Sequence, residues 1–364
     1  MKKLTNLFIV VFLLITIVSG CTNKSKPKFT VPEGTKYTTI GIEIPDISLD
    51  EDTDTWNTYI YYFSEDGSVI DKQLVFKEMP FALCYSNNVY YFALEYNDIY
   101  ELKLTTGELK KLDTNLDEHS YIECLDIRDN KLFVRYSIYN EDVQDTNNIF
   151  EGDMILNSIN ISVFDLNDIT NEKSLASDSP ADSFTDFYVT NEYVYRWDYR
   201  EDERLLTKFD FNLSQLEQMT FGSNHYVLKT TSGIYIIGDD IYDVQKETKL
   251  GIALQDNWSI MDVWNDELIV EQEDYVENKN PVYIIEAYDI KSEKKLREMS
   301  LGDQYYLSCY SSNGSEIYLL KYDDDKVTMI PFDLATFQKQ DTEFVIEFDN
   351  EGFSVSVDGL YTYK

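Results

Sequence analysis

The side chains that could perform chemistry in this chain are mostly carboxylates. There are 67 Asp and Glu residues, 31 Lys and Arg residues, and only two histidines, His119 and His225. The sequence has no P-loop, no glycine-rich dinucleotide motif and no cysteine pair at zinc spacing. Because so many carboxylates produce accidental pairs, none can be singled out as the acid and base of glycoside hydrolysis. A glycan-active enzyme, either a hydrolase or a lyase, is therefore the alternative to a protein that binds without chemistry.

One acidic run has a spacing that a metal ion could use. Asp50, Asp52 and Asp54 alternate as the first ligands of a calcium loop do. The glycine at the sixth position is missing, and Tyr61 stands where the loop needs its glutamate. This run is a weak candidate metal site, with a solvated acidic loop as the alternative, and we expect no cofactor.

The formal net charge of the chain is −36. Such a surface repels phosphate backbones, so nucleic acid is excluded as an expected partner. The charge favours a neutral or cationic ligand or protein partner, and it also keeps an exposed protein soluble.

The N-terminus is predicted to be a targeting segment. Lys2 and Lys3 precede an apolar run over residues 7–18, which is short for a bilayer span but suits a secretory signal. The run ends in Val18-Ser19-Gly20-Cys21, which resembles a bacterial lipobox. The resemblance implies a signal peptide over residues 1–20, a lipid such as palmitate on Cys21, and attachment to the extracytoplasmic side of the cell membrane. Residues 21–36 are predicted to form a flexible tether.

The rest of the chain, residues 37–364, repeats a two-part unit. The first part is a short strand, a polar turn and an aromatic strand, as in residues 81–92 and 124–135. The second part is a hairpin around an aromatic–Asp–aliphatic triplet, as in Phe164-Asp165-Leu166. The polar turns of the first part lie at Asn87, Asn130, Asn191, Ser232, Asn265, Asn313 and Asp358. A period of about 45 residues made of strands alone predicts a β-propeller.

The phase of the repeat predicts how the propeller closes. The repeats begin with a second-type hairpin over residues 59–76 and end with a first-type hairpin over residues 353–363. Together these two halves would complete one blade and leave no open edge. We therefore predict an all-β, seven-bladed propeller of four-stranded antiparallel blades, with the first blade shared by both chain ends. The pattern resembles bacterial seven-bladed propellers, YVTN/WD40-like or PQQ-like in the broad sense. Residues 37–44 are strand-like, but this count leaves no place for them.

Candidate binding residues lie in the connections between strands. Three long acidic connections, residues 45–55, 139–157 and 272–281, should emerge on one face of the propeller, and binding usually resides on such loops. Among their charges we single out Glu141, Asp142 and Asp145. Trp258 and Trp264 are candidates for stacking on a sugar, with local packing as the alternative. We expect the face with the long loops to be the functional face.

Three cysteines besides Cys21 fall in the first strand of a repeat. They are Cys84, Cys124 and Cys309, and an odd number cannot all pair. A buried single cysteine usually behaves as a small apolar residue. A disulfide between Cys84 and Cys124 is the alternative.

Overall fold

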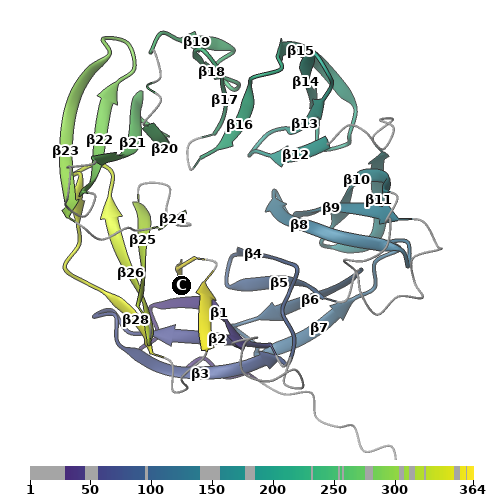
Figure 1. The fold of residues 1–364 in the computed structure, drawn as a ribbon. Helices are drawn as coiled ribbons and strands as arrows, with labels where there is room; N and C mark the ends of the chain where they lie inside the picture. The colour runs from purple at the N-terminus through teal and green to yellow at the C-terminus, as the bar shows by residue number, and fades with distance from the viewer. Residues whose placement is uncertain are drawn as a thin grey trace, which may run out of the picture.

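The computed structural model describes residues 29–45, 56–94, 97–139, 156–176, 185–230, 233–252, 255, 258–274, 282–302, 307–310, 316–323, 325–347, 353–357 and 359–364. These residues form strands and turns, with no helix among them. The strands pair into seven antiparallel sheets, which are arranged in a ring as the blades of a propeller (Figure 1); we call the axis of this ring the channel. The predicted all-β, seven-bladed fold is confirmed.

Each blade is numbered from the chain start, with its strands given from the channel outwards. Blade 1 is β29 (Phe353–Val357), β1 (Tyr37–Pro45), β2 (Asn57–Phe63) and β3 (Val69–Phe76), with β30 (Tyr361–Thr362) also on β1; blade 2 is β4 (Ala82–Ser86), β5 (Val89–Leu94), β6 (Asp98–Lys103) and β7 (Glu108–Leu112). Blade 3 is β8 (Ser120–Arg128), β9 (Lys131–Tyr139), β10 (Leu156–Asp165) and β11 (Asp168–Ala176); blade 4 is β12 (Thr185–Val189), β13 (Val194–Tyr199), β14 (Glu203–Phe209) and β15 (Gln215–Gly222).

The remaining blades follow the same order. Blade 5 is β16 (Tyr226–Lys229), β17 (Ile234–Ile237), β18 (Ile241–Asp243) and β19 (Thr248–Leu250), and blade 6 is β20 (Trp258–Trp264), β21 (Glu267–Asp274), β22 (Val282–Asp289) and β23 (Lys294–Gly302). Blade 7 is β24 (Leu307–Tyr310), β25 (Glu316–Asp323) and β26 (Lys326–Asp333), with β27 (Gln338–Lys339) and β28 (Phe344–Glu347) sharing the outer position.

The polar turns of the first-type hairpins are tight because their residues tolerate left-handed backbone. Both central residues have positive φ in the turns Asn87-Asn88, Asp129-Asn130 and Asn265-Asp266. Positive φ at both positions is the signature of the type I′ turn, whose twist matches that of the flanking strands. Asn and Asp adopt this conformation at lower cost than other non-glycine residues.

The aromatic–Asp–aliphatic triplets of the second-type hairpins also have a physical explanation. The Asp carboxylate accepts a backbone N–H from a residue shortly after it, as when Asp289 accepts from Ser292 at 2.6 Å and Asp333 from Thr336 at 2.8 Å. The following aliphatic side chain is buried between blades, as Ile290 and Leu334 are. The carboxylate therefore fixes the turn while its neighbour anchors the turn to the core.

The core is divided into clusters that lie between neighbouring blades. Ile60 and Tyr62 of β2 face blade 2, whereas Tyr61 and Phe63 of the same strand face blade 7. All four side chains are buried. Because both faces of a blade are covered, its inner strands are apolar on both sides, and this explains the continuous aromatic runs in the sequence.

Blade 1 closes the ring with strands from both chain ends, as predicted, but the division differs from the one expected. The strand order is β29-β1-β2-β3, so β1 takes the second position and only one inner position is left for the C-terminus. β29 and β30 pair with successive stretches of the same edge of β1. The interpretation of residues 353–363 as a hairpin was therefore wrong. The reason is that residues 37–44 form long ladders with both β2 and β29. The count of repeated hairpins in the sequence had left these residues without a place.

The two faces of the disc differ in their connections. We call the face with the turns between the first and second, and the third and fourth, strands of each blade the hairpin face. The opposite face, where second strands connect to third strands and blades connect to each other, is the loop face. The three long acidic connections start or end at strand ends on the loop face, such as Tyr139 and Asp274, although residues 46–55, 140–155 and 275–281 themselves lie outside the described residues.

The chain enters the disc at the hairpin face. The N–H of Phe29 donates to the carbonyl of Gly107 in the β6–β7 turn at 3.1 Å, and the Phe29 side chain is buried between blades 1 and 2. Gly107 has a φ of +66°, and a Cβ there would lie 1.7 Å from the Phe29 carbonyl oxygen. Gln73 of β3 then binds Thr30 through two hydrogen bonds. Of the predicted tether, residues 29–36 are thus packed on the blades, while residues 21–28 lie outside the described part of the chain.

Ring closure gives a first prediction. Leu360 is 1% exposed and packs between blades 7 and 1. The change Leu360→Ala should lower the free energy of unfolding by about 2–5 kcal/mol, because it removes a buried aliphatic side chain and leaves a cavity. Leu216→Ala in β15, where the side chain is 54% exposed, is the matched control and should change stability by less than about 0.5 kcal/mol. Equal unfolding curves for the two variants would contradict the closure by residues 353–364.

The buried tyrosines give a second prediction. Burial raises the pKa of Tyr85 and of Tyr288 to about 12, with the Glu286 carboxylate adding to the effect at Tyr288. Burial also raises the pKa of Tyr62, Tyr91 and Tyr195. Stability from such groups is complete below the pKa of an unfolded tyrosine, about 10, and is lost as the pH rises through the folded pKa. Phenolate absorbance should therefore rise cooperatively with loss of β-sheet circular dichroism. Ionisation of all 29 tyrosines near pH 10 in a folded protein would contradict this.

Candidate ligand site at the channel rim

Charged side chains from the inner strands of blades 3 and 4 meet at the channel. Arg135 of β9 lies with Nη2 3.3 Å from Glu123 of β8, and its Nη1 donates to Asp186 of β12. The Ser137 hydroxyl also donates to Glu123. One guanidinium therefore joins two carboxylates from neighbouring blades, in the fork geometry that arginine supports. We call Glu123, Arg135 and Asp186 the rim triad.

A bulge in β8 places Glu123 in this triad. The pairing of β8 with β9 shifts between Ile122 and Cys124, so Glu123 is the extra residue. Ile122 is fully buried against blade 2, whereas Glu123 is directed to Arg135. Bulges redirect one side chain without disturbing the rest of a strand, and they are frequent beside functional sites.

Three aromatic residues lie next to the triad at the loop-face end of the inner strands. The ring centroids of Phe81 and Tyr121 are 4.9 Å apart, and those of Tyr121 and Tyr139 are 6.4 Å apart. Phe81 is 36% exposed, and both tyrosines are partly exposed. Partial burial and the nearby Glu123 carboxylate raise the pKa of Tyr139. We call Phe81, Tyr121 and Tyr139 the rim cluster.

The rim triad and the rim cluster together offer two kinds of interaction. Exposed rings bind the apolar face of a ligand or, through their π-electrons, a cation. The triad offers fixed acceptors and donors for directional hydrogen bonds. No group of three or more His, Cys, Asp or Glu that could hold a metal ion occurs within the described parts of the chain. The arrangement suits binding of a ligand that is partly apolar and neutral or cationic.

Trp258 and Trp264, the two tryptophans predicted to contact a ligand, lie at opposite ends of β20. The Trp258 ring packs on Tyr288 with centroids 4.4 Å apart, and its Nε1 is buried without a hydrogen-bond partner among the described residues. Trp264 packs against the core between blades 6 and 7. Only Trp258 is at the loop-face end of the strand, and neither residue belongs to the rim cluster. Ligand contact by either stays a prediction.

Other predicted site residues lie outside the described residues: Cys21, Asp50, Asp52, Asp54, Glu141, Asp142 and Asp145. Tyr139 of the rim cluster is the last described residue before Glu141. Sequence reasoning overlooked Phe81 and Tyr121. The sequence feature that could have identified them is an aromatic residue near the start of the innermost strand on two consecutive blades. The propeller topology brings the starts of these strands together at the channel.

The cysteines lie on inner strands as predicted. Cys84 and Cys124 are free thiols, so the alternative of a disulfide between them is not supported. Burial raises the pKa of the Cys124 thiol, with nearby carboxylates also raising it against the effect of Lys229 and Arg135. The side chain of Cys309 lies outside the described part of the structure.

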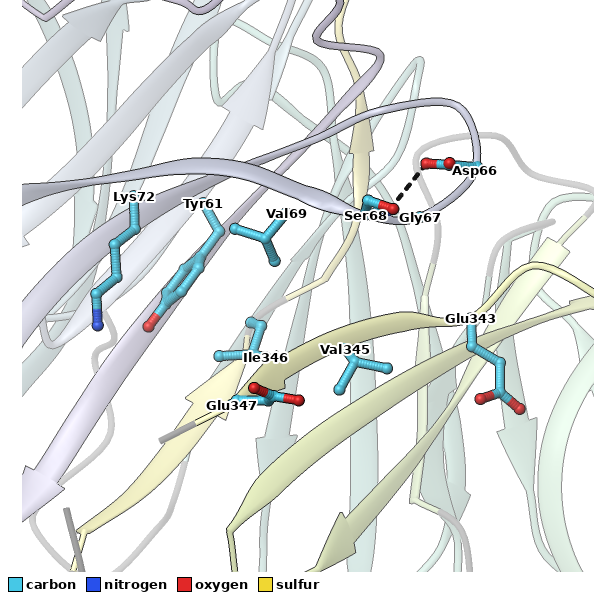
Figure 2. Close-up of a pocket in the computed structure, with 10 residues that line it drawn as sticks. All are labelled: Tyr61, Asp66, Gly67, Ser68, Val69, Lys72, Glu343, Val345, Ile346 and Glu347. Atoms are coloured by element: carbon cyan, nitrogen blue, oxygen red, sulfur yellow. Dashed lines mark hydrogen bonds between the residues drawn. The ribbon is translucent and has the colours of Figure 1, made fainter. Parts of the chain in front are cut away.

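A groove of about 540 Å³ lies between the outer strands of blades 1 and 7. Figure 2 shows blade 1 residues on one side and β28 residues on the other: Tyr61, Val69 and Lys72 face Val345, Ile346 and Glu347. The Lys72 ammonium is already paired with Glu43 at 3.2 Å and lies 5.0 Å from the Tyr59 ring centroid. Because β28 has only four residues and β3 has eight, the groove follows from the short outer strand of blade 7.

Comparison with known proteins supports the fold and nothing finer. No family model and no curated protein matches this chain. A 6-phosphogluconolactonase-like protein from Bacteroides fragilis aligns with a TM-score of 0.50 and 11% identity, over 91% of this chain and 99% of that one. AztD from Citrobacter koseri aligns with a TM-score of 0.44 and 12% identity, over 90% and 98% of the two chains.

A third similar structure is larger than this protein. Dipeptidyl peptidase 4 from Porphyromonas gingivalis aligns with a TM-score of 0.48 and 11% identity over 78% of this chain. The chain spans only about half of that protein, 48% of its length. At such low identity, the likeness with a TM-score of 0.50 shows a shared fold alone.

The rim triad gives a third prediction. Arg135→Gln leaves the Glu123 and Asp186 carboxylates close together without their cation, so it should destabilise the protein. A double-mutant cycle with Asp186→Asn should give a coupling energy of about 1 kcal/mol, measured by denaturant unfolding. Arg200→Gln is the control, because its pair with Glu203 is half exposed and lies within one blade. A coupling energy of zero would show that the triad does not join blades 3 and 4.

Proposed function

We propose that the protein is a membrane-anchored, extracytoplasmic propeller that binds a ligand or protein partner at the loop-face end of its channel. The anchor rests on the signal-like segment and on Cys21, the lipobox cysteine. Among the described residues, no helix is long and apolar enough to cross a membrane.

The observation that carries the proposal is the position of Phe29 on the hairpin face. The eight residues from Cys21 to Phe29 reach at most about 28 Å when fully extended. A lipid on Cys21 would therefore hold the hairpin face towards the membrane. The rim cluster and the strand ends that flank the acidic connections lie at the opposite end of the disc, where a partner outside the cell has access.

The chemistry of the rim limits the ligand. The chain is strongly acidic, and the rim cluster presents aromatic surface beside two carboxylates. A basic partner would be attracted over a distance of about 8–10 Å at physiological salt, the screening length of exposed charges. Aromatic rings add affinity for a cation or for the apolar face of a sugar. The expected ligand is therefore a basic peptide or a neutral glycan.

The fourth prediction tests anchoring and binding separately. Cys21→Ala should release the protein from the membrane fraction or leave an unprocessed precursor. Unchanged processing and membrane retention in that variant would refute the lipoprotein assignment. This test does not involve the binding face.

The binding arm uses residues 29–364, since Phe29 is part of the packed structure, on peptide and glycan arrays with and without calcium. Tyr121→Ala, the triple change Glu141→Gln, Asp142→Asn, Asp145→Asn, and Trp258→Ala should each weaken capture of a hit. Leu216→Ala is the folded control on an outer strand. If all three variants capture the ligand as well as the wild-type protein does, the functional face was assigned wrongly.

A further inference from the structure

A second cavity, of about 280 Å³, opens on the hairpin face between blades 3, 4 and 5. Three inner-strand ends reach it: Arg128 at the end of β8, Thr190 after β12 and Lys229 at the end of β16. It lies at the opposite end of the channel from the rim triad. Its volume is at the lower limit for small-molecule sites, so it accommodates one small organic molecule.

The floor of this cavity is built around a shared carboxylate. One Asp126 oxygen forms an ion pair with Arg128 Nη1 at 2.5 Å, and the other accepts a hydrogen bond from Lys229 Nζ at 2.7 Å. The second contact crosses from blade 3 to blade 5. The Asp126 side chain is 11% exposed, while those of Arg128 and Lys229 are 33% and 42% exposed. The carboxylate therefore lies behind the two cations, and the cations face the cavity.

Both cations have hydrogen-bond donors beyond those that Asp126 uses. An ammonium carries three N–H donors and a guanidinium five. Lys229 donates to Asp126, whereas Arg128 donates to the Ile127 carbonyl and forms an ion pair with Asp126. Asp126 cancels one of the two positive charges, so this floor has an excess of one positive charge in a chain of net charge −36. Glu192 is the carboxylate in the cavity lining, and it is exposed to solvent at the outer edge.

The walls of the cavity are held in place by tight turns. Thr190 Oγ1 accepts the Tyr193 N–H at 3.1 Å, and Thr230 Oγ1 accepts the Gly233 N–H at 3.1 Å. Gln245 Oε1 accepts the N–H of Ile234 at 3.1 Å. The Tyr193 ring is held by the Lys208 ammonium, 4.3 Å from its centroid. Since these groups are fixed before any ligand arrives, binding loses little conformational entropy.

From this geometry we infer a second ligand site, which takes a small molecule carrying a carboxylate or phosphate group. The anionic oxygens bind the outward donors of Arg128 and Lys229, while Asp126 keeps the two cations in position. Planar and point-like donors side by side are a common arrangement for phosphate and carboxylate recognition. The preferred ligand is therefore opposite in charge to the one expected at the rim.

The test uses inorganic phosphate as the probe, titrated against the protein at constant ionic strength with melting temperature and calorimetry as readouts. Lys229→Met should weaken phosphate binding about tenfold, the effect of losing about 1.4 kcal/mol of interaction. Lys249→Met is the matched control, because Lys249 is also on blade 5 and paired with an aspartate, Asp240, but lies outside the cavity. Equal effects of the two changes, or no binding to the wild-type protein, would overturn the inference.

A further variant tests the sign of the charge effect. Glu192→Gln removes a negative charge from the cavity lining and leaves Asp126 in place, so it should tighten phosphate binding. Weaker binding in this variant would overturn the inference, because a cationic or hydroxyl-rich ligand uses the carboxylate as an acceptor. Circular dichroism of each variant establishes that it is folded.

A final experiment distinguishes two sources of the phosphate group, a free soluble molecule and a lipid headgroup. Vesicles of phosphatidylcholine with and without phosphatidylglycerol are compared with free phosphate. Capture of free phosphate identifies a soluble ligand, and capture of phosphatidylglycerol vesicles alone identifies a lipid headgroup. Both results support the site when Lys229→Met weakens them about tenfold, and capture that Lys229→Met leaves unchanged contradicts it.

Discussion

The pairing of β1 with strands from the opposite end of the chain is the contact on which the propeller depends. β1 forms backbone ladders with β2 on one side and with β29 and β30 on the other. Without the C-terminal strands, blade 1 would present an unpaired inner edge to the channel. The N–H of Tyr363 donating to the Lys36 carbonyl extends the same contact to the hairpin face. Closure fixes the angles between blades, and therefore the position of every group on the channel wall.

Hydrophobic clusters fill the space between neighbouring blades, and charged side chains form a second kind of contact between inner strands. Arg135 joins blade 3 to blade 4, and Lys229 joins blade 5 to blade 3. Partly buried ion pairs contribute little net stability, because removing the charges from water costs about as much as their attraction returns. Apolar residues would hold these blades together at least as well. The binding roles that we propose for these charges therefore do not require a contribution to stability.

Much of the fold could be predicted from the sequence because its determinants are local. The type I′ turns at Asn87, Asn130 and Asn265 and the aspartates that cap the outer turns recur with the blade period. The place of residues 37–44 could not be predicted, since it depends on a ladder with strands more than 300 residues away. The docking of Phe29 on Gly107 could not be predicted either, because it also joins residues that are distant in the sequence. The rim triad depends on a bulge at Glu123, which the alternation of residues does not reveal.

The channel wall of blade 3 then has two chemically different ends. Along β8, Tyr121 and Glu123 lie towards the loop face, and Asp126 and Arg128 lie towards the hairpin face, with the partly buried Cys124 between them. At the first end, one arginine serves two carboxylates, so acceptors are in excess. At the second, two cations serve one carboxylate, so donors are in excess. In our two proposals, β8 therefore separates a site for a neutral or cationic ligand from a site for an anionic ligand.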